Sequence, residues 1–201
     1  MKKLYILIVV LLISCSSDVP ILSPLSNDAI ILAFGDSLTY GVGASSDTNY
    51  PAVLSKLIQR EIINAGIPGE RTAQGLERLP ELLEEYNPNL LILCHGGNDM
   101  LQKTGEKQAA DNIISMIQIA QEYGTEVVLI GVPKPRLFLP SAPDFYAEIA
   151  TKMNIPYDGK IMAYVLSKKA FKSDIVHPNV KGYQKIATAI AELLKQAKAI
   201  Q

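Results

Sequence analysis

The sequence is poor in several residue types on which whole classes of function depend. Among its 201 residues there are no Trp, two Cys and two His, and its 19 Lys and Arg nearly balance its 20 Asp and Glu. Binding to a phosphate backbone requires an excess of basic residues, and stacking on bases requires many aromatic side chains. The chain has neither, so we expect no nucleic-acid partner. Two cysteines exclude a disulfide scaffold, and with two histidines they leave too few ligands for a typical zinc site.

Several short motifs are missing as well. The chain contains no G-x-S-x-G, which excludes the usual nucleophile turn of α/β-hydrolases. It also has no Walker lysine, no H-E-x-x-H and no complete dinucleotide-binding glycine pattern. The 48% of hydrophobic residues argues against disorder, so a globular domain without these common sites remains.

The N-terminus has the composition of a targeting segment. Lys2 and Lys3 precede an unbroken apolar run at residues 4–13. This run is too short to span a membrane, which takes about 20 residues, but is typical of a signal peptide. It leads into Leu-Ile-Ser-Cys at residues 12–15, which resembles the lipobox of bacterial lipoproteins, whose cysteine is acylated and becomes the new N-terminus. An ordinary signal peptide that happens to contain a cysteine is the alternative.

The lipobox resemblance implies a location. We expect residues 1–14 to be the signal peptide, Cys15 to carry the lipid, and residues 15–28, which are rich in Ser, Asp and Pro, to form a tether. Because two or three acyl chains anchor a protein stably, we expect a membrane-bound lipoprotein of the bacterial cell envelope, on the periplasmic face. Ser16 resembles the outer-membrane sorting signal of Gram-negative lipoproteins. Cys94, alone in an apolar run, would be a small core residue.

The rest of the chain, residues 29–201, alternates between strand and helix patterns and shows no internal repeat. Short apolar runs predict strands, and apolar residues at helical spacing predict helices. Continuous apolar strands separated by helices are typical of a parallel sheet covered on both faces, so we expect one α/β domain with a three-layer α/β/α sandwich and a five-stranded parallel sheet. The predicted strands are residues 29–34, 62–65, 90–94, 127–130 and 155–157, and the predicted helices are residues 50–60, 72–86, 107–123, 142–153 and 180–199.

Parallel sheets bind ligands outside the carboxyl ends of their strands, and polar residues gather there in this sequence. Ser37 follows the first predicted strand and Asn98 follows the third, where its side-chain amide could donate hydrogen bonds. Asp174 lies three residues before His177, so its carboxylate could hold Nδ1–H while Nε2 faces outward. Singly, each has an ordinary explanation as a helix cap, a turn or a surface loop. The segments concerned are residues 35–41, 66–72, 95–99 and 174–179.

Together and in this order, the four segments resemble the motif blocks of the SGNH (GDSL) hydrolase family. The likeness runs from about Ile30 to Leu194 and is strongest to the small bacterial thioesterase/lysophospholipase-type and arylesterase members. It implies a flavodoxin-like fold, an esterase acting on small-molecule or lipid esters, and no cofactor or metal; we expect a monomer. The matching motifs are Gly35-Asp-Ser-Leu-Thr39, Asn64-Ala65 leading to Gly69, Leu76-x-Arg-Leu-Pro80, Gly96-Gly-Asn-Asp99 and His177-Pro-Asn179.

The resemblance also implies a role for each residue of these motifs. Ser37 would be the nucleophile, His177 the general base and Asp174 the group that orients His177. The oxyanion hole would use the backbone N–H of Ser37, the backbone N–H of Gly69 and the side-chain amide of Asn98. Preorganised donors of this kind stabilise the charge that develops on the carbonyl oxygen during acyl transfer.

Two departures leave alternatives open. Glu70 and Arg71 depart from the family pattern after Gly69, so Gly66 remains a second candidate for the oxyanion N–H. His95 stands before the glycine pair, where relatives often carry another residue. We interpret it as a hydrogen-bonded loop histidine; the alternative is a group that tunes His177 or touches the substrate.

The substrate is open too. The implied reaction is hydrolysis of acyl esters or thioesters, including lysophospholipids, and the loop of residues 131–146 with Leu137, Phe138 and Leu139 would supply an apolar wall. The same catalytic residues could remove acetyl groups from carbohydrate, and a surface lipoprotein could bind without catalysis. Because the residue set is intact, we favour an enzyme.

Overall fold

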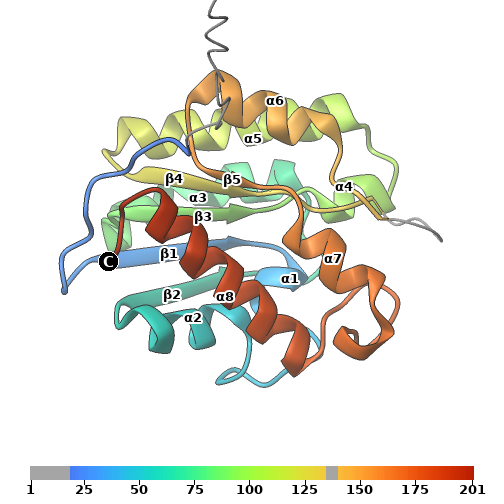
Figure 1. Cartoon of the computed structure of the whole chain (residues 1–201). Helices are drawn as coiled ribbons and strands as arrows, with labels where there is room; N and C mark the ends of the chain where they lie inside the picture. Colours follow the sequence, from blue (N-terminus) through green and yellow to red (C-terminus); the bar gives the residue numbers. More distant parts are fainter. Residues whose placement is uncertain (1–18, 135–139) are drawn as a thin grey trace, which may run out of the picture.

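The computed structural model describes residues 19–134 and 140–201 (Figure 1). The expected signal peptide, Cys15, and Leu137, Phe138 and Leu139 lie outside the described residues. The strands are β1 (Ile30–Gly35), β2 (Glu61–Gly66), β3 (Leu90–Cys94), β4 (Glu126–Ile130) and β5 (Tyr157–Asp158). The helices are α1 (Ser37–Tyr40), α2 (Tyr50–Ile58), α3 (Thr72–Tyr86), α4 (Gly97–Leu101), α5 (Glu106–Glu122), α6 (Asp144–Met153), α7 (Ile161–Ser167), the 3₁₀ helix η1 (Lys169–Phe171) and α8 (Val180–Gln196).

The strands form one parallel sheet of five, in the order β2-β1-β3-β4-β5. Each β1 residue pairs with β2 in register from Ile30 opposite Glu61 onward, and β1 pairs with β3 on its other side. This is the flavodoxin-like order. After β1 the chain adds β2 on one side of it, and then crosses over to add β3, β4 and β5 on the other side. Because right-handed connections in opposite directions place their helices on opposite faces, helices cover both faces of the sheet.

Helices cover both faces of the sheet and make the predicted three layers (Figure 1). On one face α2 packs against α8, and on the other α3 packs against α5, with α6 beside α5. The amphipathic spacing of α3, expected at residues 72–86, is present over the whole helix, although Pro80 lies inside it. Asn49 begins α2 by accepting a hydrogen bond from Ala52 N–H, as a helix cap does.

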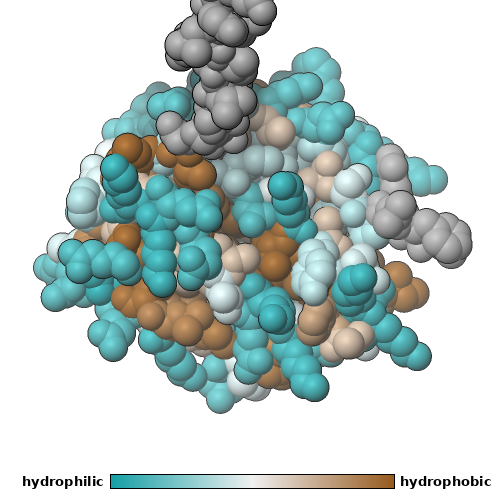
Figure 2. All heavy atoms as spheres, viewed as in Figure 1, coloured by the Kyte–Doolittle hydropathy of each residue, from teal (hydrophilic) through white to brown (hydrophobic). Residues whose placement is uncertain are grey.

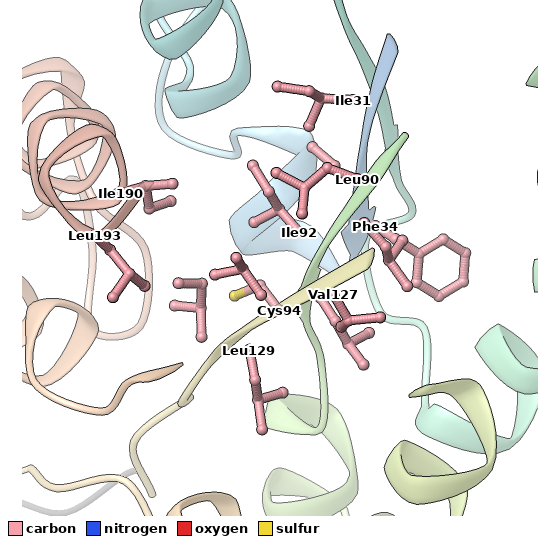
Figure 3. Packing of buried hydrophobic residues seen from close by; sticks show 14 of the residues in the cluster. Ile31, Phe34, Leu90, Ile92, Cys94, Val127, Leu129, Ile190 and Leu193 are labelled. Atoms are coloured by element: carbon pink, nitrogen blue, oxygen red, sulfur yellow. The ribbon is translucent and has the colours of Figure 1, made fainter. Parts of the chain in front are cut away.

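The core lies between the sheet and its two helical layers. Every residue of β3 is buried, as are nearly all residues of β1 and β4, which explains why their sequences are continuously apolar. Figure 3 shows Ile190 and Leu193 of α8 pointing at the strands, while the Phe34 ring points to the opposite side of the sheet. Cys94 is buried in this core with its thiol reduced, as expected.

All predicted strands and helices are present, but several ends differ. The last strand was predicted at residues 155–157 and lies instead at Tyr157–Asp158, because Pro156 has no N–H to pair with a neighbouring strand. The last helix ends at Gln196 and not at residue 199, since Lys198 adopts a left-handed backbone. The prediction lacked the short elements α1, α4, α7 and η1, of which α1 and α4 hold only one turn or slightly more and show no periodicity.

The described part of the expected tether lies along the domain. The backbone N–H groups of Leu22 and Leu25 donate to the carbonyls of Ala197 and Ala199. These contacts lie beside the C-terminus, at the end of the sheet away from α1, α4 and α7 (Figure 1). On the face in Figure 2, hydrophobic side chains lie in separate groups among hydrophilic ones. Within residues 19–134 and 140–201, none of the helices has the length and hydrophobicity that spanning a bilayer would need.

Candidate active site

The candidate site lies at the switch point of the sheet, where β1 has β2 on one side and β3 on the other. In open parallel sheets the crevice outside the carboxyl ends of the strands at this point is the usual place for a ligand. The elements that follow these strand ends, α1 and α4, gather there with α7 (Figure 1). Ser37 is the first residue of α1 and Asn98 lies in the first turn of α4.

The segment carrying Ser37 is fixed by its neighbours. The carboxylate of Asp36 accepts a hydrogen bond from Leu38 N–H at 3.0 Å and so caps α1. Gly35 precedes it because a side chain there would meet Cys94 O at 2.0 Å. Burial raises the pKa of Asp36, a carboxylate that is 1% exposed. Ser37 therefore leaves the sheet at a defined angle, with its hydroxyl directed out of the sheet edge.

Three of the predicted residues form one chain of hydrogen bonds. Ser37 Oγ lies 3.0 Å from His177 Nε2, and His177 Nδ1 lies 2.7 Å from Asp174 Oδ2. A carboxylate can only accept, so Nδ1 of a neutral His177 carries the proton and Nε2 is free to accept from the Ser37 hydroxyl. Ser37 and His177 are 140 residues apart in the chain, so the fold alone brings them together.

The loop before α8 holds Asp174 and His177 in place. Lys172 and Pro178 form an antiparallel bridge, and Ser173 N–H donates to His177 O at 3.0 Å. Asp174 Oδ1 accepts from the backbone N–H groups of Val176 and His177, both at 2.8 Å. Burial acts to raise the pKa of Asp174, but the hydrogen bonds from the His177 ring and these two N–H groups outweigh it, so the pKa is lowered.

The three residues expected to form the oxyanion hole, Ser37, Gly69 and Asn98, all line the same cavity. Gly69 lies in a turn with φ +82°, and nothing lies within 4 Å of where its Cβ would be. Among the described residues, no acceptor receives a hydrogen bond from the N–H of Ser37 or of Gly69. Asn98 Nδ2 donates to Glu70 O at 2.9 Å and approaches Asp36 Oδ2 at 3.4 Å.

Gly66, the alternative to Gly69, lies elsewhere. It is the last residue of β2, and its N–H donates to Asn64 Oδ1 at 3.0 Å. A side chain at Gly66 would meet Tyr40 N at 2.1 Å, so this glycine allows β2 and α1 to approach each other. Gly69 lines the cavity beside Ser37, and Gly66 does not.

Behind Gly69 lies a buried ionic cluster that the sequence interpretation missed. The Glu70 carboxylate accepts from Arg78 Nε at 2.6 Å and Nη2 at 2.7 Å, and from His95 at 3.1 Å. Arg78 Nη2 also donates to Ala65 O at 2.7 Å, and the guanidinium lies 4.1 Å from the centre of the Phe34 ring. Burial acts to raise the pKa of Glu70, but the hydrogen bonds from His95 and Arg78 lower it.

His95 belongs to this cluster and not to the cavity. Its side chain is fully buried, and its Nδ1 accepts a hydrogen bond from Gly96 N–H at 2.9 Å. The proton of the neutral ring is therefore on Nε2, which donates to Glu70. The structure thus places His95 as a hydrogen-bonded loop histidine that faces Glu70. Gly75 leaves room for it, because a side chain at that position would meet His95 Nε2 at 2.6 Å.

Asp99 also braces this side of the site. Its two carboxylate oxygens accept from Thr72 N–H at 2.9 Å and from the Thr72 hydroxyl at 2.7 Å. Asn112 of α5 donates in turn to the Thr72 hydroxyl at 2.9 Å. The start of α3 is thereby tied to α4 and α5, which fixes the turn that contains Gly69.

A cavity of about 1070 Å³ opens beside Ser37 and His177. Most of its lining is apolar, and lysines from two separate segments of the chain join the lining. Within the described residues, no group of three or more His, Cys, Asp or Glu side chains gathers as metal ligands would. The apolar and cationic members of the lining are Leu38, Val42, Pro68, Leu101, Val132, Pro133, Pro140, Leu166, Ile175, Val176, Lys134, Lys168 and Lys172.

Comparisons with known proteins agree with this architecture. The chain is 27% identical to an arylesterase of Vibrio mimicus over 82% of this chain and 87% of that one. It is 28% identical to thioesterase 1/protease 1/lysophospholipase L1 of Escherichia coli over 82% of this chain and 83% of that one. The chain is 36% identical to esterase TesA of Pseudomonas aeruginosa over 110 residues, which cover 52% of this chain and 55% of that esterase.

A solved structure of TesA superimposes with a TM-score of 0.75 and 26% identity, covering 84% of this chain and 99% of that one. The psychrotrophic esterase EstA of Pseudoalteromonas shares the fold with a TM-score of 0.74 at 24% identity, covering 84% of this chain and 98% of that one. The sequence pattern of the GDSL-like lipase/acylhydrolase family matches residues 33–185, most of the chain. The protein therefore belongs to the GDSL (SGNH) lipase/acylhydrolase family, a family of esterases.

Proposed function

We propose that the protein is a serine hydrolase of acyl esters and thioesters, with Ser37, His177 and Asp174 as its catalytic triad. The observation that carries this proposal is the continuous hydrogen-bond chain from Ser37 Oγ to His177 to Asp174, with heavy-atom distances of 3.0 and 2.7 Å. Both distances lie within the reach that proton transfer between a nucleophile, its base and an orienting carboxylate requires.

The reaction begins with acylation. His177 Nε2 takes the proton of Ser37 as its oxygen attacks the substrate carbonyl carbon, and a tetrahedral intermediate with a negatively charged oxygen forms. His177, now an imidazolium stabilised by Asp174, gives that proton to the leaving alcohol or thiol, and an acyl-enzyme remains. Water then attacks the acyl carbon with His177 again as base, which releases the carboxylic acid and restores Ser37.

Three donors would stabilise the charged oxygen of both intermediates. The N–H groups of Ser37 and Gly69 donate to no described acceptor and are free to bind it. Asn98 would supply the third N–H, exchanging its long 3.4 Å contact with Asp36 for the oxyanion and keeping its 2.9 Å bond to Glu70. Each such donor contributes about 100- to 1,000-fold to the rate.

The cavity supports acyl substrates, including lysophospholipids. Its largely apolar lining suits a hydrocarbon chain, which gains free energy when it leaves water. The printed names of the relatives point the same way, since they include an arylesterase and a thioesterase/lysophospholipase.

Hydrolysis of p-nitrophenyl acetate, butyrate, octanoate and palmitate by the full-length protein in detergent tests the proposal. Wild type should release nitrophenol, and Ser37→Ala should not. Ser115→Ala on α5 is a matched control and should behave as wild type, because Ser115 only bonds the backbone of its own helix. Equal rates for wild type and Ser37→Ala would contradict the proposal, and a profile confined to acetate would contradict the longer-acyl substrate class.

The location is also proposed. The support is the apolar run at residues 4–13 followed by Cys15, which together resemble a lipoprotein signal. We propose that residues 1–14 are removed and that lipid on Cys15 anchors the domain of residues 29–201 to a membrane of the bacterial envelope, facing the periplasm. Such an anchor sets where the enzyme meets its substrate and leaves the chemistry unchanged.

A further inference from the structure

The charges around the cavity are distributed unevenly. Residues 159–173, which include α7 and η1, contain four lysines and no Asp or Glu, although the whole chain has a formal net charge of −1. Two of these lysines, Lys168 and Lys172, line the cavity that contains Ser37 and His177. Neither forms an ion pair with any residue that the structure describes.

The nearby acidic groups that the structure describes form no ion pair with these lysines. Asp36 is the one acidic side chain among the described residues lining the cavity, and it is 1% exposed and turned toward Leu38 N–H and Asn98. Asp174 gives its carboxylate to three hydrogen bonds, from Val176 N–H, His177 N–H and the His177 ring. Lys134, on another wall, is already paired with Glu106 at 2.6 Å. Two lysines without an ion-pair partner among the described residues thus lie on the α7–η1 side of the cavity.

The α7–η1 side of the cavity is also the side on which His177 lies. Lys172 forms a backbone bridge with Pro178, and Ser173 between them binds His177 O, so Lys172 and His177 belong to one tight loop. In the proposed reaction His177 must protonate the leaving group, which therefore has to lie against His177. Lys168 lies in the turn next to Lys172, since Phe171 N–H donates to Lys168 O at 3.0 Å. Both lysines therefore line the cavity on the side of the leaving alcohol or thiol and not at the far end of the acyl chain.

We propose that the enzyme selects esters and thioesters whose leaving alcohol or thiol carries a phosphate, with Lys168 and Lys172 as the residues that recognise it. The inference rests on the proposed function, because it uses His177 as the general acid. An ammonium group binds phosphate as a point charge, and lysines at the mouth of a cavity also raise the local concentration of anionic substrates. The phosphate could belong to a lysophospholipid head group or to a coenzyme A-type thiol carrier.

Two matched substrate pairs separate these sources. Octanoylglycerol phosphate and octanoylglycerol differ only in the phosphate of a lipid-like leaving group. Octanoyl-4′-phosphopantetheine and octanoyl-pantetheine differ only in the phosphate of a thiol leaving group. For each pair the measured quantity is the ratio of kcat/KM for the phosphate-bearing substrate to kcat/KM for the neutral one, at low ionic strength.

Wild type should prefer the phosphate-bearing member of at least one pair, and that pair identifies the source. The double variant Lys168→Gln/Lys172→Gln should lower this ratio about 3- to 10-fold, because two charge contacts, one at an exposed and one at a half-buried lysine, are lost. Lys152→Gln/Lys185→Gln, on the exposed surfaces of α6 and α8, changes the net charge equally and should leave the ratio as in wild type. Raising the salt concentration should reduce the wild-type ratio and affect that of Lys168→Gln/Lys172→Gln less.

A wild-type ratio near one for both pairs would overturn the inference, as would equal ratios in the two double variants. These results leave the proposed hydrolase intact, since the neutral substrates are still cleaved through Ser37. If no substrate is cleaved and Ser37→Ala equals wild type even on p-nitrophenyl esters, the proposed function itself is overturned.

Discussion

The buried ionic cluster behind Gly69 leads to a prediction about stability. Glu70→Gln keeps the size and shape of the side chain and removes its charge. The Glu70 side chain is 4% exposed, and its partner Arg78 is 20% exposed. Removing one member of a buried ion pair costs about 3–5 kcal/mol, because the other charge is left without compensation. Arg78 keeps its hydrogen bond to Ala65 O and some contact with water, so we expect the lower end, about 3 kcal/mol.

For a domain of this size, a loss of about 3 kcal/mol lowers the melting temperature by roughly 6 to 12 °C. Urea unfolding and thermal melts followed by circular dichroism measure both quantities. Glu84→Gln, on the exposed surface of α3, is the matched control and should change stability by less than about 0.5 kcal/mol.

The stability difference between wild type and Glu70→Gln should depend on pH in a defined direction. The fold lowers the pKa of Glu70 below its ordinary 4.5, so the unfolded chain binds the proton more readily. The stabilisation is therefore complete well above pH 4.5 and is lost as the pH falls through the pKa of the folded state. A difference that is absent at pH 7, or that stays constant from pH 7 down to pH 3, would refute the reasoning.

Three further predictions concern the site and the anchor. Asn98→Ala should lower kcat about 100-fold or more with an unchanged circular dichroism spectrum, because one oxyanion donor is lost; an unchanged kcat would remove Asn98 from that role. Asp174→Asn should lower kcat by up to about 10⁴-fold. The fold lowers the pKa of Asp174 below its ordinary 3.8, so this carboxylate stays charged between pH 7 and pH 5. Any fall of wild-type activity in that range must therefore come from the titration of another group. The same fall should then be seen in Asp174→Asn. Cys15→Ala should move the protein from the membrane to the soluble fraction, and a variant that still sediments with membranes would contradict lipidation at Cys15.

Much of the fold could be predicted because its strongest signals are local. The apolar runs of β1, β3 and β4 are buried on both faces, and such runs occur in parallel sheets with helices on each side. Once the strands were known to be parallel, their carboxyl ends had to meet at one edge. This geometry explains why Ser37 and Asn98, which follow β1 and β3, could be expected to lie together, whereas the place of His177 beside Ser37 was implied by the family resemblance.

The rest depends on contacts that no local pattern reveals. Glu70 looks like an ordinary turn residue, yet its carboxylate is buried against Arg78 on the next helix and His95 after β3. The buried glutamate directly after a turn glycine, and the arginine in Leu76-x-Arg-Leu-Pro80, were the available signals, but nothing in their spacing shows that they meet. Helix α7 was missed because its seven residues follow a two-residue strand, too little for a periodic pattern.

The positions of single glycines were likewise decided by packing. Gly66 and Gly69 stand in the same turn sequence and could not be told apart by composition. The structure separates them, because Gly66 is packed against the backbone of Tyr40 whereas Gly69 opens to the cavity with φ +82°. A positive φ favours glycine, which is why a residue with a side chain would be strained at Gly69.

The central claim is that Ser37 is a nucleophile activated by His177. Labelling the full-length protein with a serine-reactive phosphonate, followed by peptide mass spectrometry, tests it most directly, because the label reports the activated hydroxyl whatever the natural substrate is. We expect one adduct, on the peptide that contains Ser37, and its loss in His177→Ala, which leaves the hydroxyl in place. A label on another serine, or equal labelling of Ser37 without His177, would contradict the account.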